Sequence, residues 1–252
     1  MEKPSTSEPS SPSPTHSTTD AFAWTRSLAV LGAIALAFFA GQFLDALITF
    51  RLLHTSVADA RANHLTWGIV AGQFAGYLPI LAVLLWAVPW AGRRSLRELG
   101  LRWFDRRALG AGLIGTVAMY AVTIGVAGIQ FAFTHQKPEE TAISLFTSTH
   151  DAALIVSFTI LATIAAPFME EFVFRGFVFG ALRRSMPVWF AATLSGIAFG
   201  IAHGSASAFL PLAASGIVLA YVYDRSGSLA ASMLAHALFN LINVALLALG
   251  KT

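Results

Sequence analysis

The chain is a series of long apolar runs separated by short polar connectors. A helix needs about 20 apolar residues to cross a bilayer, because each residue advances the helix by about 1.5 Å. The pattern predicts an all-α fold, a polytopic transmembrane helix bundle of about seven to eight spans. The candidate runs cover residues 27–50, 65–90, 108–133, 152–182, 188–205, 206–224 and 228–249.

The same pattern divides the chain into three regions. Residues 1–22 are rich in Ser, Thr and Pro with almost nothing to bury, which predicts a disordered tail. Residues 23–151 are predicted to form N-terminal transmembrane helices and connectors, and residues 152–249 the transmembrane helices that carry the chemistry. The first run, 27–50, is too long for the core of a signal peptide and is therefore expected to be retained as a span.

The fourth run is longer than a bilayer requires. As one helix, residues 152–182 would extend about 46 Å, which exceeds the hydrocarbon thickness of about 30 Å. The helix must therefore tilt, kink or protrude. A kink is predicted at Pro167, because proline has no N–H to donate to the carbonyl of Thr163.

Composition supports the membrane interpretation and narrows the chemistry. Hydrophobic residues make up 56% of the chain and charged residues 12%, against about 25% charged in soluble domains. The chain has no cysteine, which excludes disulfides, thiolate zinc sites and cysteine nucleophiles. The net charge is +3, but the arginines concentrate in one short connector, which indicates a topology signal rather than a nucleic-acid surface.

Arginine placement predicts the orientation of the spans. The connector at residues 91–107 holds six arginines and is expected on the cytoplasmic side. Alternation then places Arg183, Arg184 and Arg225 inside and residues 134–151 outside, so the N-terminus lies inside and the chain belongs in the cytoplasmic membrane. Residues 96–103 are predicted to lie on the inner surface as a short amphipathic helix.

Ionisable side chains within the runs are costly and therefore informative. Asp45 stands alone in the first run, where Gln42, Asp45 and Gln73 are expected to take part in hydrogen bonds between the first two spans. The others all fall in the later runs, and helical rise places them near mid-membrane, within about two turns of one another. These are Glu170, Glu171, Arg175, His203 and His236, and Asn240 lies at a similar depth.

Helical spacing assigns different tasks to the two glutamates. Glu171 and Arg175 are four residues apart, which favours an ion pair on one helix face. Glu170 is rotated by about 100° and is free to act as a general base for water, with His203 sharing that water or receiving its proton. His236 and Asn240 share a helix face and could donate hydrogen bonds to the charge developing on a carbonyl oxygen.

At these residues the sequence resembles the CAAX protease and bacteriocin-processing (CPBP) family of intramembrane glutamic endopeptidases, which includes the type II CAAX prenyl endopeptidases. The resemblance covers about residues 150–245 and rests on three motifs in order along successive membrane helices. They are EEFVFR (Glu170, Glu171, Arg175), FGIAH (Phe199, His203) and HALFN (His236, Asn240).

The resemblance implies a membrane-embedded, metal-independent peptidase without a cofactor, in which Glu170 and His203 activate water. It implies that His236 and Asn240 form the oxyanion site, and that Glu171, Arg175 and Phe199 support the geometry. The implied partners are the lipid bilayer and a peptide or protein substrate that is lipidated or membrane-inserted. CAAX-type processing and leader or bacteriocin processing are both implied.

Other functions remain compatible with the same residues. Glu170, His203 and His236 supply enough donors for a zinc protease, although the HExxH spacing is missing. A non-catalytic membrane partner or immunity protein could keep the charges as an interhelical network. A proton-coupled transporter also uses buried carboxylates and histidines, but no inverted repeat is evident.

Overall fold

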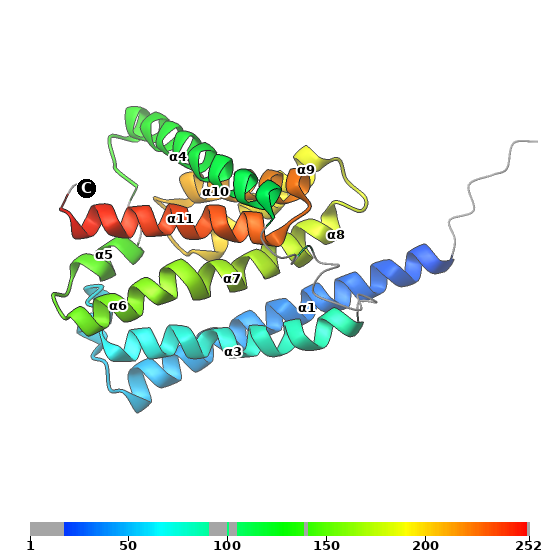
Figure 1. Ribbon diagram of the computed structural model, residues 1–252. Coiled ribbons are helices and arrows are strands. Elements are labelled where there is room, and N and C mark those ends of the chain that lie inside the picture. The colour runs from blue at the N-terminus through cyan, green and yellow to red at the C-terminus, as the bar shows by residue number, and fades with distance from the viewer. Residues whose placement is uncertain (1–17, 91–99, 101–104, 139–140, 251–252) are drawn as a thin grey trace, which may run out of the picture.

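The computed structural model describes residues 18–90, 100, 105–138 and 141–250. Within these ranges every regular element is a helix, as predicted (Figure 1). In chain order they are α1 (Thr18–Ala46), η1 (Leu47–Leu52), α2 (Val57–Arg61), α3 (Trp67–Trp90), α4 (Arg106–Thr134), α5 (Thr141–Thr147), α6 (Ala152–Ile160), η3 (Leu161–Ala165), α7 (Ala166–Glu171), η4 (Phe172–Phe179), α8 (Gly180–Leu182), α9 (Val188–Ala202), α10 (Phe209–Ser226) and α11 (Leu229–Ala248), where η denotes a π-helix.

Each of the seven predicted runs contains a helix, but the helices differ in length. Five are long and apolar enough to cross a membrane: Leu28–Leu52, Trp67–Trp86, Arg106–Thr134, Ala152–Leu182 and Leu229–Ala248. Helix α9 is apolar but has only 15 residues, which corresponds to a length of about 22 Å. The predicted run 188–205 was therefore too long, because the helix ends at Ala202.

Two sequence predictions fall wholly or partly outside the described residues. The first helix begins at Thr18, so residues 18–22 of the predicted tail are helical and not disordered. The rest of that tail, residues 1–17, lies outside the described residues. So does nearly all of the predicted amphipathic segment 96–103, of which Gly100 alone is described.

The first two spans form a hairpin, in which α1 and η1 pack along α3. Polar contacts join them within the membrane. The Gln73 amide donates to Asp45 Oδ2 at 3.0 Å, and the Thr49 hydroxyl donates to Asp45 Oδ1 at 3.0 Å. The predicted hydrogen bonding between the first two spans is therefore confirmed for Asp45 and Gln73. The intramembrane carboxylate in the N-terminal half is held by donors of this hairpin.

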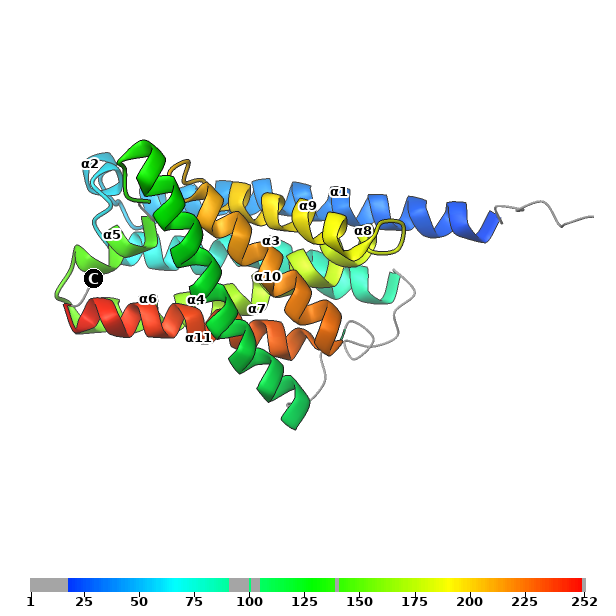
Figure 2. The same ribbon diagram turned by 90° about the horizontal axis from the view of Figure 1, so that it is seen from above.

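The C-terminal helices form a second group. Helices α9 and α10 pack closely, and α4 runs alongside α10 and crosses α11 obliquely (Figure 2). Glycine permits the close approach of α9 to α10: a Cβ on Gly196 would lie 2.6 Å from the carbonyl oxygen of Ala213, and one on Gly216 would lie 2.9 Å from the Cα of Gly196. The shorter α9 is thereby fixed against α10, and His203 at its end has a defined position.

The long helix between these groups is continuous from α6 to α8 (Figure 1). It packs on α3 on one side and on α11 on the other. A hydrophobic cluster that includes Val30, Leu84, Met169, Phe172 and Leu229 joins it to α1, α3 and α11. The two adjacent glutamates thus lie in the middle of the long helix, between the N-terminal hairpin and the C-terminal group.

The long helix accommodates Pro167 through π-helical turns. Wider turns occur in η3, directly before Pro167, and again in η4, and the N–H of Ala166 donates to the carbonyl of Leu161 in the π-helical register. In that register the carbonyl of Ala162 would need the N–H of residue 167, which proline lacks. The amide of Asn240 donates to this carbonyl instead, at 2.8 Å. A contact from α11 therefore replaces the missing backbone bond.

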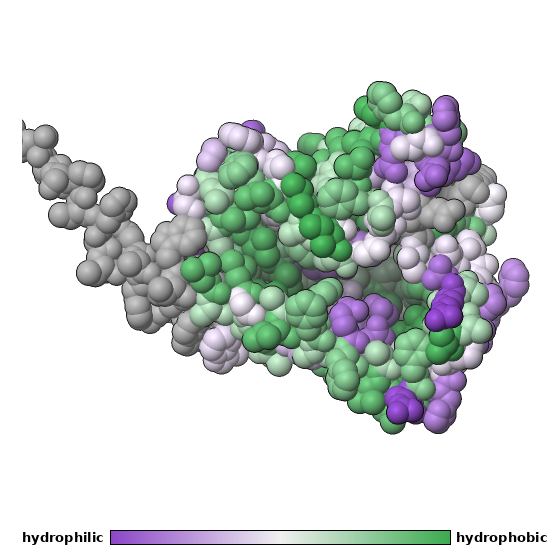
Figure 3. Space-filling model, turned by 180° about the vertical axis from the view of Figure 1, so that it is seen from behind, coloured by the Kyte–Doolittle hydropathy of each residue, from purple (hydrophilic) through white to green (hydrophobic). Residues whose placement is uncertain are grey.

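The surface of the bundle is that of a membrane protein. Large apolar side chains are exposed along the spans, for example Leu36 and Ile114 at 72% and Phe133 at 84%. The face seen in Figure 3 is largely hydrophobic, with hydrophilic residues gathered mainly toward one end. So large a continuous apolar surface is typical of contact with lipid. The chain is therefore a multi-pass membrane protein.

Candidate active site

The predicted site residues come from three separate helical segments and converge inside the bundle. Glu170 and Glu171 end α7, His203 caps the C-terminus of α9, and His236 with Asn240 lies on α11. The predicted run 188–205 placed His203 inside a span. In the structure α9 ends at Ala202, so His203 follows the helix directly and does not lie within it. Its place at the helix end directs the imidazole toward the long helix, 3.8 Å from Glu170.

Glu171 and Arg175 form the ion pair that their spacing predicts. Arg175 Nη1 lies 3.1 Å from Glu171 Oε1, and both side chains are 0% exposed. Arg175 Nη2 donates to the carbonyl of Gly216 at 2.9 Å, which ties the pair to α10. The guanidinium also lies over the ring of Phe199, 4.7 Å from its centroid. The ion pair is thus held in place by contacts with α10 and Phe199, next to the site.

Glu171 receives two further donors from α11. His236 Nδ1 lies 3.0 Å from Glu171 Oε1, and the hydroxyl of Ser232 donates to Oε2. Sequence reasoning missed Ser232, although it lies one turn before His236 on the same helix face and is fully buried. With these partners Glu171 is held as a structural carboxylate that orients His236.

Glu170 is in the opposite situation. Its Oε2 is buried and has no hydrogen-bond partner within the described part of the chain. Two imidazole nitrogens face it, His203 Nε2 at 3.8 Å and His236 Nε2 at 3.9 Å. These separations are too long for direct hydrogen bonds and short enough for one bridging water. The geometry therefore separates one satisfied glutamate from one that is available for chemistry.

The second nitrogen of each imidazole fixes which atom carries the proton. His203 Nδ1 lies 2.8 Å from the carbonyl oxygen of Phe199, and His236 Nδ1 faces the Glu171 carboxylate. Both partners are acceptors, so both Nδ1 atoms must donate. In the neutral imidazoles each Nε2 then presents a lone pair toward Glu170. Three hydrogen-bond acceptors thus face one another: Glu170 Oε2 and the Nε2 atoms of His203 and His236. A water molecule or an added proton between them supplies the missing hydrogen-bond donor.

Phe199 and Asn240 complete the surroundings. The Phe199 ring centroid lies 4.5 Å from that of His203 and 5.7 Å from that of His236, so it packs between the imidazoles and Arg175. One amide proton of Asn240 is donated to the carbonyl of Ala162. Its other amide proton is what could reach a substrate.

The residues considered as zinc ligands were Glu170, His203 and His236. Across residues 18–90, 100, 105–138 and 141–250, no group of three or more His, Asp or Glu side chains has the spacing to hold a metal ion.

The cluster lies within the part of the chain that resembles a known family. Residues 152–242 match the model of the family described as "Type II CAAX prenyl endopeptidase Rce1-like". A Bacillus subtilis (strain 168) protein named "Putative membrane peptidase YdiL" is 24% identical over 179 residues, which cover 69% of this chain and 68% of the relative. No solved structure matches the chain significantly.

Helices that cross the bilayer and a segment matching a membrane endopeptidase define the class: the chain is a membrane protease. The two matches support the CAAX protease and bacteriocin-processing family, the same family that the three motifs resemble. All seven motif residues, from Glu170 to Asn240, lie inside the matched segment.

Proposed function

We propose that the chain is an intramembrane endopeptidase of the glutamic type, in which Glu170 and His203 activate the water that hydrolyses the peptide bond. The observation that carries the proposal is Glu170 Oε2, buried without a hydrogen-bond partner among the described residues and facing two imidazole nitrogens at 3.8 and 3.9 Å. A bare carboxylate beside imidazoles is suited to taking a proton from water. A buried carboxylate oxygen without a partner calls for an explanation, and activation of water supplies one.

The proposed reaction follows from these positions. Water bound at Glu170 gives a proton to the carboxylate as its oxygen adds to the scissile carbonyl. Glu170 or His203 then returns a proton to the leaving nitrogen, so the C–N bond breaks and a carboxylate and an amine are released. No covalent intermediate with the protein is needed, in agreement with the absence of cysteine from the chain.

His236 and Asn240 are the proposed oxyanion donors. Since His236 Nδ1 already donates to Glu171, its Nε2 can donate only when the ring is protonated. Glu171 is the buried anion that stabilises such an imidazolium, and Arg175 offsets its charge. Asn240 adds its free amide proton. The oxyanion site is therefore expected to depend on the Glu171 and Arg175 pair, although neither contacts the substrate.

The proposed substrate is a peptide or protein at or within the membrane, lipidated or membrane-inserted. Glu170, His236 and Asn240 lie on helices long and apolar enough to cross a membrane, and the matched family is described as a prenyl endopeptidase. CAAX-type cleavage and leader or bacteriocin processing both satisfy this description.

A peptide library in liposomes tests the function and separates these substrate types. We expect the purified protein to cleave membrane-associated peptides, and a His203→Ala variant to lose about 100-fold or more in rate. Mass spectrometry of the fragments, with prenylated and unprenylated forms of each peptide, identifies the preferred class. Cleavage that persisted unchanged in His203→Ala would contradict the role of His203. Loss of cleavage with a chelator, together with stoichiometric zinc in the protein, would favour the zinc protease.

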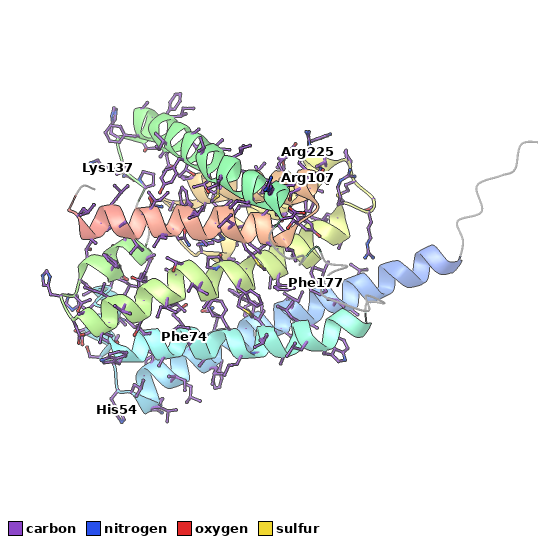
Figure 4. The ribbon with its side chains drawn as sticks, in the orientation of Figure 1. His54, Phe74, Arg107, Lys137, Phe177 and Arg225 are labelled. Atoms are coloured by element: carbon purple, nitrogen blue, oxygen red, sulfur yellow. The ribbon has the colours of Figure 1, made fainter. Side chains whose placement is uncertain are left out.

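We further propose that the arginine-rich end of the bundle faces the cytoplasm, which places the N-terminus inside the cytoplasmic membrane. Figure 4 shows Arg107 and Arg225 close together toward one end and His54 and Lys137 at the other. Arg107 Nη2 donates to the carbonyl of Arg225 at 3.3 Å. A concentration of arginine at one end supports this orientation.

The cysteine-free chain allows a direct test of orientation. Single cysteines can replace two exposed residues at opposite ends, Lys137 and Ser185. In intact cells an impermeant thiol reagent is expected to label Lys137→Cys, and to label Ser185→Cys only after permeabilisation. The reverse pattern would show that the bundle is inverted.

A further inference from the structure

The site includes a side chain from α3, outside the segment that matches the family. Helix α3 packs on α6, η3 and α7 of the long helix. Tyr77 is partly buried on this helix and packs against two hydrophobic clusters, one containing Met169 and Phe172 and the other Phe158 and Leu161. Its side chain therefore meets the long helix on both sides of Pro167, next to the glutamates.

The phenol of Tyr77 reaches the catalytic carboxylate. Its hydroxyl lies within hydrogen-bonding reach of the Glu170 side chain. Arg175 interacts electrostatically with Glu170, and the Nε2 atoms of His203 and His236, which act as acceptors when the rings are neutral, also face Glu170. A tyrosine hydroxyl is a donor at neutral pH. Tyr77 thus supplies the hydrogen-bond donor that the two neutral imidazoles do not supply.

We infer that Tyr77 is a positioning residue for Glu170, whose hydroxyl holds the carboxylate in the orientation that leaves Oε2 directed at the two imidazoles. This inference rests on the proposed function of Glu170. The N-terminal hairpin is then part of the catalytic unit and not only a membrane anchor.

Tyr77→Phe removes the hydroxyl and keeps the ring that fills the two clusters. We expect kcat for peptide cleavage to fall about 10-fold or more with KM changed less than about twofold, because the lost bond orients the base and does not bind substrate. The acidic limb of the pH profile of kcat/KM is expected to move along the pH axis. A mere loss of folded protein would lower the profile without moving it.

Tyr120 provides a matched control. Its hydroxyl is also partly buried between helices, where it lies 3.1 Å from the carbonyl oxygen of Phe239 and 2.9 Å from Asn243 Oδ1. Tyr120→Phe is expected to leave the position of the pH profile unchanged. A Tyr77→Phe protein with the kcat and pH profile of the wild type, beside an inactive Glu170→Gln, would overturn the inference while the proposed function stands. An active Glu170→Gln would overturn the proposed function itself.

Discussion

Replacing Glu170 by glutamine is expected to lower kcat for peptide cleavage by about 100- to 10,000-fold, the range that a general base contributes. The amide has nearly the same shape but cannot accept a proton from water. Because Glu170 Oε2 makes no hydrogen bond within the described structure, the fold loses little. The amide can also donate to the lone pairs at Nε2 of His203 or His236, so the variant should unfold at nearly the temperature of the wild type.

Asp45→Asn is the control for this change. Besides Glu170 and Glu171, Asp45 is the third intramembrane carboxylate in the described spans, and its oxygens accept from Thr49 and Gln73. Exchange of its carboxylate for an amide tests whether loss of any membrane-embedded acid impairs the enzyme. The measurement is the rate of peptide cleavage by the purified Glu170→Gln and Asp45→Asn variants in liposomes. If Glu170→Gln kept half of the wild-type rate, the water-activation mechanism would be wrong.

Replacing Arg175 by methionine is expected to destabilise the protein by about 3–5 kcal/mol, because it leaves the Glu171 carboxylate buried without its cation. Both side chains are 0% exposed, so water cannot replace the lost partner. Methionine keeps much of the side-chain volume against Phe199. Denaturant unfolding in detergent measures the effect. Adding Glu171→Gln to Arg175→Met should restore part of the loss, since the double variant buries no unpaired charge.

The exposed pair Arg183 and Asp224 offers a comparison at the same separation. Arg183 Nε lies 3.1 Å from Asp224 Oδ1, but the arginine side chain is 45% exposed. Arg183→Met is therefore expected to change stability by no more than about 1 kcal/mol. Equal losses for Arg175→Met and Arg183→Met would show that burial does not govern the Glu171 pair.

Local spacing was sufficient to predict part of the site. The four-residue interval between Glu171 and Arg175 predicted their ion pair, and helical rise brought His203 and His236 to the depth of Glu170. These results depend on geometry within one helix or on distances from the membrane surface. Both are contained in the order of residues along the chain.

Contacts between helices were not predictable in the same way. The donor from Asn240 to Ala162 depends on a π-helical register that places the missing N–H at Pro167, and apolar periodicity does not distinguish π from α turns. The donors from Ser232 to Glu171 and from Tyr77 to Glu170 depend on which faces of separate helices meet. Serine and tyrosine are too common in membrane helices to identify such roles by composition.

The limited length of α9 affects how reactant water arrives. At about 22 Å it is shorter than the hydrocarbon core of about 30 Å, and the polar loop 203–208 follows directly after it. A membrane-embedded helix shorter than the hydrocarbon core is accommodated by local thinning of the bilayer. Hydration would then descend along one side of the protein to the imidazole of His203, so that hydrolysis inside a lipid layer proceeds without an open pore.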